Sequence, residues 1–220
     1  MAVFYRDYFN PDGFYKGVCP KGHYNEMITQ TLPHEMLFDI AINAIGDHYY
    51  RESVSSFAAS VERYFEFAIY VLTHHKDVAN DEVTKAWKLI SSQSERQLGA
   101  YIFAYTGVFG TTPAVLSTKM TERRNNVIHR GHLPTLAEAR EFGGACYEVI
   151  QQGVFTLRRD CLPSVNAQLI RVMSDRIAKH GEGVPRSTQV SPTALNIITD
   201  ISLGYLSFEA ILQQRGIPTS

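Results

Sequence analysis

The sequence has few cysteines, no long apolar run and almost no net charge, and each shortage excludes a class of protein. Its three cysteines form no Cys-x-x-Cys pair, so we expect no disulfide scaffold and a reducing, cytoplasmic environment. No stretch of about 18 residues is apolar and uncharged, so we expect no transmembrane helix and no membrane partner. The 21 basic and 22 acidic side chains nearly cancel, so nucleic acid could bind only through a local patch.

Several catalytic signatures are absent as well. The sequence has no P-loop, Gly-x-Gly-x-x-Gly, His-Glu-x-x-His or Gly-x-Ser-x-Gly motif, which argues against ATPases, dinucleotide-binding enzymes, zinc proteases and serine hydrolases. The segment Cys19-Pro-Lys-Gly-His23 offers two ligands, whereas a structural zinc needs about four. We therefore predict an ordinary Pro-Gly turn there, and neither a metal nor a cofactor in the protein.

Hydrophobic residues make up 45% of the 220 residues and recur mostly at helical spacing. This pattern predicts an all-α fold, an up-and-down bundle of antiparallel helices. The predicted helices span residues 32–46, 50–75, 80–91, 94–108, 114–129, 136–157 and 164–179, with a short helix over 208–213.

The two ends of the chain differ from this bundle. Residues 1–30 are rich in Tyr, Phe, Gly and Pro, which predicts an extended arm with one short hairpin. The arm's aromatic side chains are expected to pack on the bundle or on a second subunit; they are Phe4, Tyr5, Tyr8, Phe9, Phe14 and Tyr15. The domain prediction is an arm over 1–30, a bundle over 31–180, and a linker with a short C-terminal element over 181–220.

The most informative stretch runs from Glu122 to His132 and places polar side chains at a predicted helix end. Asn125 and His129 are four residues apart and share a helix face, which the long side chain of Arg124 can also reach. A guanidinium binds phosphate with fixed geometry, and an imidazole moves protons near neutral pH. Together they could cleave RNA without a metal, because the imidazole activates the ribose 2′-hydroxyl while Arg124 stabilises the phosphate.

The motif Arg124-Asn125-x-x-x-His129, followed by Gly131, resembles the signature of the HEPN superfamily, in which Asn commonly follows the Arg directly. The resemblance implies a small antiparallel helical bundle that dimerises, with the motif helices meeting at the dimer cleft. It also implies a metal-independent endoribonuclease of toxin–antitoxin, abortive-infection or phage-defence systems. Arg124 and His129 would be the catalytic pair and Asn125 their polar support. One subfamily carries Tyr two positions after the His, where this sequence has Gly131.

Two acids are predicted to support this site. Glu66 lies on an aromatic-rich helix face, four residues after Glu62, where a carboxylate needs a cationic partner. We expect Glu66 to pair with Arg123 or Arg124 behind the catalytic residues. Glu122, inside the motif stretch, is the second expected supporting acid.

Basic residues beside the motif are predicted to hold RNA. Residues 119–132 carry four Lys or Arg against one acid, and the predicted RNA contacts are Lys119, Arg123 and Arg130. Residues 158–186 form a second basic segment. Two such segments in a neutral chain could frame a groove for single-stranded RNA.

Three interpretations of the chain stay open. The leading one is a cytoplasmic, homodimeric endoribonuclease that leaves 2′,3′-cyclic phosphate ends, with RNA as substrate and an antitoxin or a neighbouring-gene protein as a candidate partner. The second is a non-catalytic module of the same type that binds RNA, a nucleotide or a protein. The third is a purely structural interaction protein that has no affinity for RNA. The stretch from Glu122 to His132 could also be a solvated, salt-bridged helix end, with His129 as a favourable cation.

Overall fold

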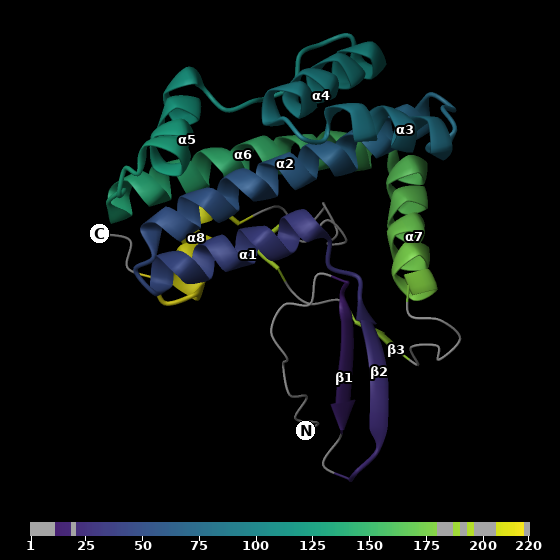
Figure 1. Cartoon of the computed structure of the whole chain (residues 1–220), viewed down its shortest axis with the longest axis horizontal. Helices are drawn as coiled ribbons and strands as arrows, with labels where there is room; N and C mark the ends of the chain where they lie inside the picture. Colours follow the sequence, from purple (N-terminus) through teal and green to yellow (C-terminus); the bar gives the residue numbers. More distant parts are fainter. Residues whose placement is uncertain (1–11, 19–20, 180–186, 190–192, 196–205, 218–220) are drawn as a thin grey trace.

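The computed structural model describes residues 12–18, 21–179, 187–189, 193–195 and 206–217 (Figure 1). These residues are mostly helical, which confirms the predicted all-α fold class. The strands are β1 (Phe14–Val18), β2 (Tyr24–Thr29) and β3 (Ser187–Gln189). The helices are α1 (Pro33–Gly46), α2 (Tyr50–His75), α3 (Asn80–Ile90), α4 (Ser94–Phe109), α5 (Thr118–Arg130), α6 (Leu136–Asp160), α7 (Leu162–Lys179) and α8 (Phe208–Gln214).

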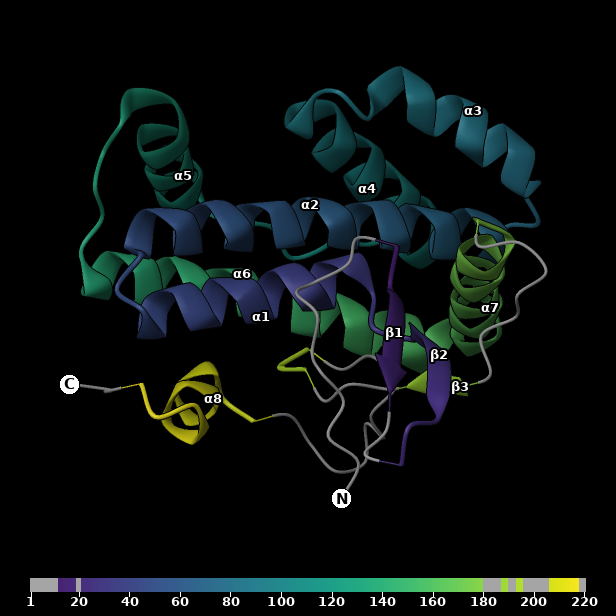
Figure 2. The same ribbon diagram turned by 60° about the horizontal axis from the view of Figure 1, so that its bottom comes forward.

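Helix α2 is the central element of the bundle. It runs between α1 and α6 on one side and α3, α4 and α5 on the other (Figure 2). Fourteen of its 26 residues are buried, and from Tyr64 to Leu72 every residue except Glu66 is buried. Because a helix segment that is buried all round must be covered on several sides, the other helices gather around α2.

Helix α6 can lie close to α2 because two of its residues have no side chain. A Cβ on Gly143 would lie 2.6 Å from the ring of Phe57, and a Cβ on Gly153 would lie 1.8 Å from the Tyr64 hydroxyl. Tyr64 is fully buried, and its hydroxyl lies 3.4 Å from that of Tyr101 on α4. The two glycines therefore set the α2–α6 spacing, and Tyr64 links that contact to α4.

Helix α5 begins later than the pattern predicts. The expected start was residue 114, but Ser117 is the N-cap and its hydroxyl accepts the backbone N–H of Met120. A serine cap satisfies one of the otherwise unpaired first-turn N–H groups, so the helix begins at Thr118. The other boundaries agree with the prediction to within three residues.

Helix α4 is apolar on most of its surface, yet only Gln97 and Tyr101 are buried. Phe103, on its outer side, is 81% exposed.

Among the helices of the described residues, none combines the length and the apolar character that crossing a membrane requires.

The N-terminal segment forms the predicted hairpin. β1 and β2 pair antiparallel, with Phe14 opposite Ile28 and Val18 opposite Tyr24, and the hairpin projects away from the helices (Figure 1). The structure adds β3, which pairs parallel to β2 and which the sequence pattern did not predict. Three residues are too short to show a strand period. The predicted packing of Phe4, Tyr5, Tyr8 and Phe9 lies outside the described residues, whereas Phe14 is buried.

One buried cation fastens the hairpin to the bundle. The guanidinium of Arg176, on α7, donates to the backbone carbonyls of Thr29 at 2.6 Å and Thr31 at 2.9 Å. Arg176 is only 6% exposed. Because a buried charge is costly without partners, these carbonyls hold α7 against the end of β2.

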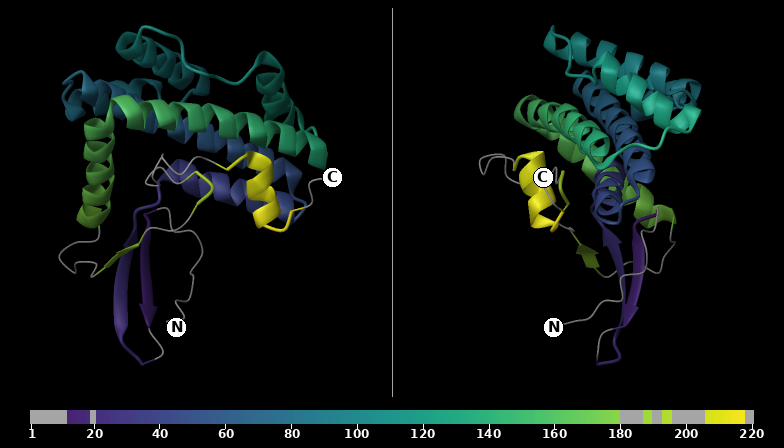
Figure 3. Two further views of the ribbon diagram at one scale, coloured as in Figure 1. Left: turned by 180° about the vertical axis from the view of Figure 1, so that it is seen from behind. Right: turned by 90° about the vertical axis from the view of Figure 1, so that its left-hand side faces the viewer.

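The C-terminal helix α8 completes the core on the side that is visible from behind (Figure 3). The ring of Phe208 lies 5.9 Å from that of Phe57 and 6.0 Å from that of Tyr147. The Tyr147 hydroxyl donates to the Leu206 carbonyl at 2.6 Å. Phe208, Ile211, Leu212 and Ile217 therefore belong to the same hydrophobic core as α1, α2 and α6.

His34 is a polar side chain inside this core. It is fully buried between the rings of Tyr64 and Phe67, and neither ring nitrogen has a hydrogen-bond partner among the described residues. Burial lowers the pKa of His34 from 6.5 to about 3. The folded chain therefore keeps this imidazole neutral over the range in which the unfolded chain protonates it.

We expect Gly153→Ala to destabilise the protein by about 3 kcal/mol, because the new Cβ would overlap the buried Tyr64 hydroxyl. Gly144→Ala is the matched control on the same helix, since its Cβ would meet Phe208 at an ordinary 3.5 Å. Alanine favours a helix over glycine, so the control should be neutral or slightly stabilising. Urea denaturation measures both, and equal effects would contradict the close approach of α2 and α6.

We expect His34 to make the protein sensitive to acid. Its folded pKa of about 3 lies below the unfolded value of 6.5, so its contribution to stability is complete above pH 6.5 and is lost as pH falls toward 3. Between pH 7 and pH 5 the loss should be about 2 kcal/mol. Unfolding free energies at both pH values test this: His34→Leu should lose about that much less than the wild type, and equal losses would contradict a buried neutral imidazole.

Candidate functional site

Helix α5 presents the motif residues at a sharply ended C-terminus. Gly131 follows the helix with a φ of 72°, and the backbone N–H groups of Gly131 and His132 both donate to the carbonyl of Asn126. This left-handed glycine ends the helix as the sequence predicts. Met120 and Val127 anchor the buried side of α5, which leaves its polar residues at the borders with α2, α4 and α6.

Arg124 is held by three hydrogen bonds at the border of α5 with α2 and α4. Nη2 donates to the Glu62 carboxylate at 2.8 Å and to the Ser94 hydroxyl at 3.2 Å, and Nη1 donates to the Asn125 side-chain oxygen at 3.0 Å. The side chains of Arg124 and Glu62 are only 17% and 27% exposed. Asn125 therefore orients Arg124, and the guanidinium has little freedom to leave this position.

The prediction that Glu66 pairs with Arg123 or Arg124 was wrong. Glu66 pairs with Arg63 at 2.7 Å, one turn away on α2 itself, and not with Arg123 or Arg124. Burial raises the pKa of the Glu66 carboxyl, and the charges of Arg63 and Arg171 oppose this shift. Arg124 instead binds Glu62, because that carboxylate, one turn earlier on α2, is the one that reaches α5.

His129 shares a charged neighbour with Arg124. The pKa of the Glu95 carboxyl is lowered, first by a hydrogen bond from its own backbone N–H, and further by the Ser94 hydroxyl and the charges of Arg124 and His129, while burial opposes these effects. Arg124 and His129 therefore both act electrostatically on the Glu95 carboxylate, at the start of α4. His129 is exposed to solvent at this border.

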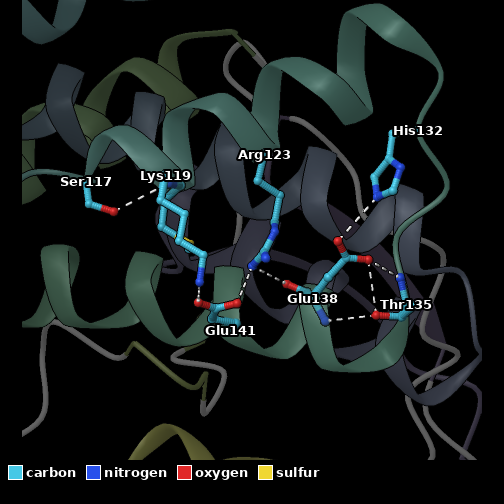
Figure 4. A network of polar contacts seen from close by, with 8 residues as sticks. Ser117, Lys119, Arg123, His132, Thr135, Glu138 and Glu141 are labelled. Carbon is cyan, nitrogen blue, oxygen red and sulfur yellow. Dashed lines mark hydrogen bonds and ion pairs between the residues drawn. The ribbon is translucent and has the colours of Figure 1, made fainter.

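The predicted RNA contacts are already engaged within the chain. Glu141 on α6 pairs with Lys119 and, at 2.6 Å, with Arg123 (Figure 4). The Arg123 side chain is only 13% exposed. Arg130 is exposed and donates to the Asn126 side-chain oxygen at 3.1 Å. The cations therefore do not form one patch, because Arg123 faces α6 while Arg124 faces α2 and α4.

The predicted supporting acid Glu122 is exposed, on the solvent side of α5. The acid beside His132, Glu138, has a structural role instead. Glu138 accepts the backbone N–H of Thr135 at 2.8 Å in the capping box that starts α6, and it lies 3.4 Å from His132 (Figure 4). The polar network between α5 and α6 therefore fixes how these two helices join.

Sequence reasoning missed Glu62, Ser94 and Glu95 as members of this site. The helix start at Ser94 was predicted, but nothing in the local pattern brings it to a residue 30 positions later. Glu62 and Glu66 are four residues apart and share one face of α2. Only the rotation of α2 in the bundle decides which of them faces Arg124. No signal in the single sequence could have made that choice.

Metal ligands do not gather in the described part of the chain, where no three His, Cys, Asp or Glu side chains could hold an ion. Cys19 of the Cys-x-x-x-His segment lies outside the described residues. Cys146 and Cys161 are free and buried, and burial raises the pKa of both thiols. These two thiols are therefore held in their neutral form.

We expect the Arg124–Glu62 pair to contribute about 1 kcal/mol of coupling to folding stability, because both groups are largely shielded from water. A double-mutant cycle with Arg124→Met and Glu62→Gln measures this. The exposed Lys85–Glu82 pair, at 69% and 65% exposure, is the control and should couple by less than about 0.5 kcal/mol. Equal couplings would mean that Arg124 is not held as the structure indicates.

The geometry of this site can be compared with no known relative. No protein-family model, no curated protein and no solved structure matches the chain. The functional interpretation therefore rests on the arrangement of Glu62, Ser94, Glu95, Arg124 and His129, and this arrangement is the candidate functional site.

Proposed function

We propose that the protein is a metal-independent endoribonuclease of the HEPN type, with Arg124 and His129 as its catalytic pair. The observation that carries the proposal is the common neighbour of the two residues, the start of α4. Arg124 contacts Ser94 there, and Arg124 and protonated His129 both act on the Glu95 carboxylate. A guanidinium and an imidazole with a common neighbour are a combination that can cleave a phosphodiester.

The chemistry assigns one role to each group. In its neutral form, the imidazole of His129 removes the proton from a ribose 2′-hydroxyl, whose oxygen then bonds to the adjacent phosphorus. Arg124 stabilises the charge that develops on the phosphate oxygens. The bond from phosphorus to the 5′-oxygen breaks, and that oxygen takes up a proton. The products are a 2′,3′-cyclic phosphate and a 5′-hydroxyl, and the step consumes no metal or cofactor.

The proposal extends to a homodimer that acts in phage defence or toxin-type growth control. A second copy would bring a second His129, so that one imidazole could act as base and the other as acid. The exposure of His129 supports this arrangement, because a buried imidazole could not meet a partner chain. An antitoxin or another neighbouring-gene protein is a candidate partner of the same surface.

The pattern of ion pairs favours a second candidate, a non-catalytic module that binds RNA, a nucleotide or a protein. Arg124 is paired with Glu62, and Lys119 and Arg123 are paired with Glu141. These acids reduce the positive charge that RNA would meet. Under this alternative, binding survives His129→Ala and no RNA products form.

Incubation of the purified protein with RNA in EDTA tests the proposal. We expect cleavage that His129→Ala and Arg124→Ala each slow by about 100-fold or more, which is the usual scale for a lost acid–base group or charge stabiliser. The new 3′ ends should resist ligation until a phosphatase that opens cyclic phosphates has acted.

His132→Ala is the matched control for this experiment. His132 is three residues from His129 but lies beside Glu138 of the α6 capping box, so this variant should cleave RNA at the wild-type rate. Melting temperatures establish that the variants are folded. Wild-type rates in both His129→Ala and Arg124→Ala would exclude this site, and RNA binding without products would favour the non-catalytic candidate.

A further inference from the structure

The site contains an internal anion, the carboxylate of Glu95. The Arg124 guanidinium donates to the Ser94 hydroxyl at 3.2 Å, and that hydroxyl donates to the Glu95 carboxylate at 3.3 Å. The carboxylate also accepts its own backbone N–H at the start of α4, and the charge of His129 acts on it. The Glu95 carboxylate is therefore hydrogen-bonded to the same hydroxyl, that of Ser94, that the Arg124 guanidinium contacts.

The local sequence explains why the carboxylate occupies this position. α4 begins after Gln93, whose side chain makes no capping hydrogen bond. First-turn N–H groups then need another acceptor, and an acid in the first turn also interacts favourably with the helix dipole. Glu95 meets both needs and is the acidic residue of that turn.

The two acids around Arg124 are held to different degrees. Glu62 bonds directly to the guanidinium at 2.8 Å and is largely shielded from solvent. Glu95 is exposed and reaches Arg124 only through Ser94. A rotation of the Glu95 side chain would remove its charge from the site without disturbing the packing, whereas Glu62 cannot leave without releasing Arg124.

We propose that Glu95 is a displaceable internal competitor, whose carboxylate occupies the place beside Arg124, Ser94 and His129 that an RNA phosphodiester takes when it binds. Binding of RNA then requires Glu95 to swing into solvent, while Glu62 stays and keeps Arg124 oriented. Glu95 thereby weakens the binding of RNA and sets the affinity of the site for it. The inference rests on the proposed function only in taking RNA as the source of the phosphate.

Fluorescence anisotropy with a labelled 2′-O-methyl RNA, which cannot be cleaved, tests the competition at low salt. We expect Glu95→Gln to tighten binding about three-fold, the size of the repulsion between two unit charges about 6 Å apart in water. Glu82→Gln is the matched control, because Glu82 is also an exposed first-turn acid, on α3, and pairs with Lys85. Glu82→Gln makes the same change in net charge. It should tighten RNA binding less, because it does not remove the carboxylate that is hydrogen-bonded to Ser94 beside Arg124.

A second pair of variants separates competition for Arg124 from a general charge effect. In an Arg124→Ala background, Glu95→Gln should tighten RNA binding no more than Glu82→Gln does, because the cation for which the carboxylate competes is gone. Equal tightening by Glu95→Gln and Glu82→Gln in the wild-type background would overturn the proposal. The proposal would also be overturned if Glu95→Gln tightened RNA binding by the full factor in the Arg124→Ala background. Melting temperatures of all variants control for loss of the α4 helix start.

Cleavage in EDTA separates this inference from the proposed function. At RNA concentrations below saturation, Glu95→Gln should raise the cleavage rate by the same factor as the affinity. Tighter binding of Glu95→Gln with no cleavage by any variant would support the competitor and overturn the nuclease. Wild-type cleavage with no difference between Glu95→Gln and Glu82→Gln would overturn the competitor and leave the nuclease standing. Absence of RNA binding by every variant would overturn the competitor.

Discussion

The close approach of α6 to α2 is the constraint on which the rest of the structure depends. It exists because Gly143 and Gly153 leave room for the rings of Phe57 and Tyr64. Tyr64 then reaches Tyr101, so the position of α4 depends on the same contact. Since α5 and α4 both rest on α2, the packing of two helices determines where the motif residues meet the start of α4.

The candidate site is built from opposite charges at helix borders and not from a basic patch. Arg124 is held between Glu62, Asn125 and Ser94, and Arg123 is held by Glu141. Pairing restricts a long side chain and so prepares it to bind a phosphate in one geometry. It also lowers the field that attracts nucleic acid from a distance. Under the proposed function, the site would therefore favour a defined phosphate contact over non-specific attraction of RNA.

Most of the architecture was predictable from the sequence, because helix ends and apolar spacing are local signals. The bounds of α2, Tyr50–His75, agree with the prediction, and Gly131 ends α5 as expected. Two features were not predicted from the sequence, for physical reasons. The three residues of β3 carry no recognisable period, and the start of α5 depends on which of several polar residues caps it, here Ser117.

For the candidate site, the sequence by itself determined that Arg124, Asn125 and His129 share the end of one helix, because their spacing and Gly131 are local properties of the chain. Only the tertiary structure decided which acids face them. Glu62 and Glu66 are equivalent by spacing, and the rotation of α2 gives Glu62 to Arg124 and leaves Glu66 to Arg63. Glu95 joins the site through the packing of α4 against α2, which depends on side-chain contacts between residues far apart in the sequence.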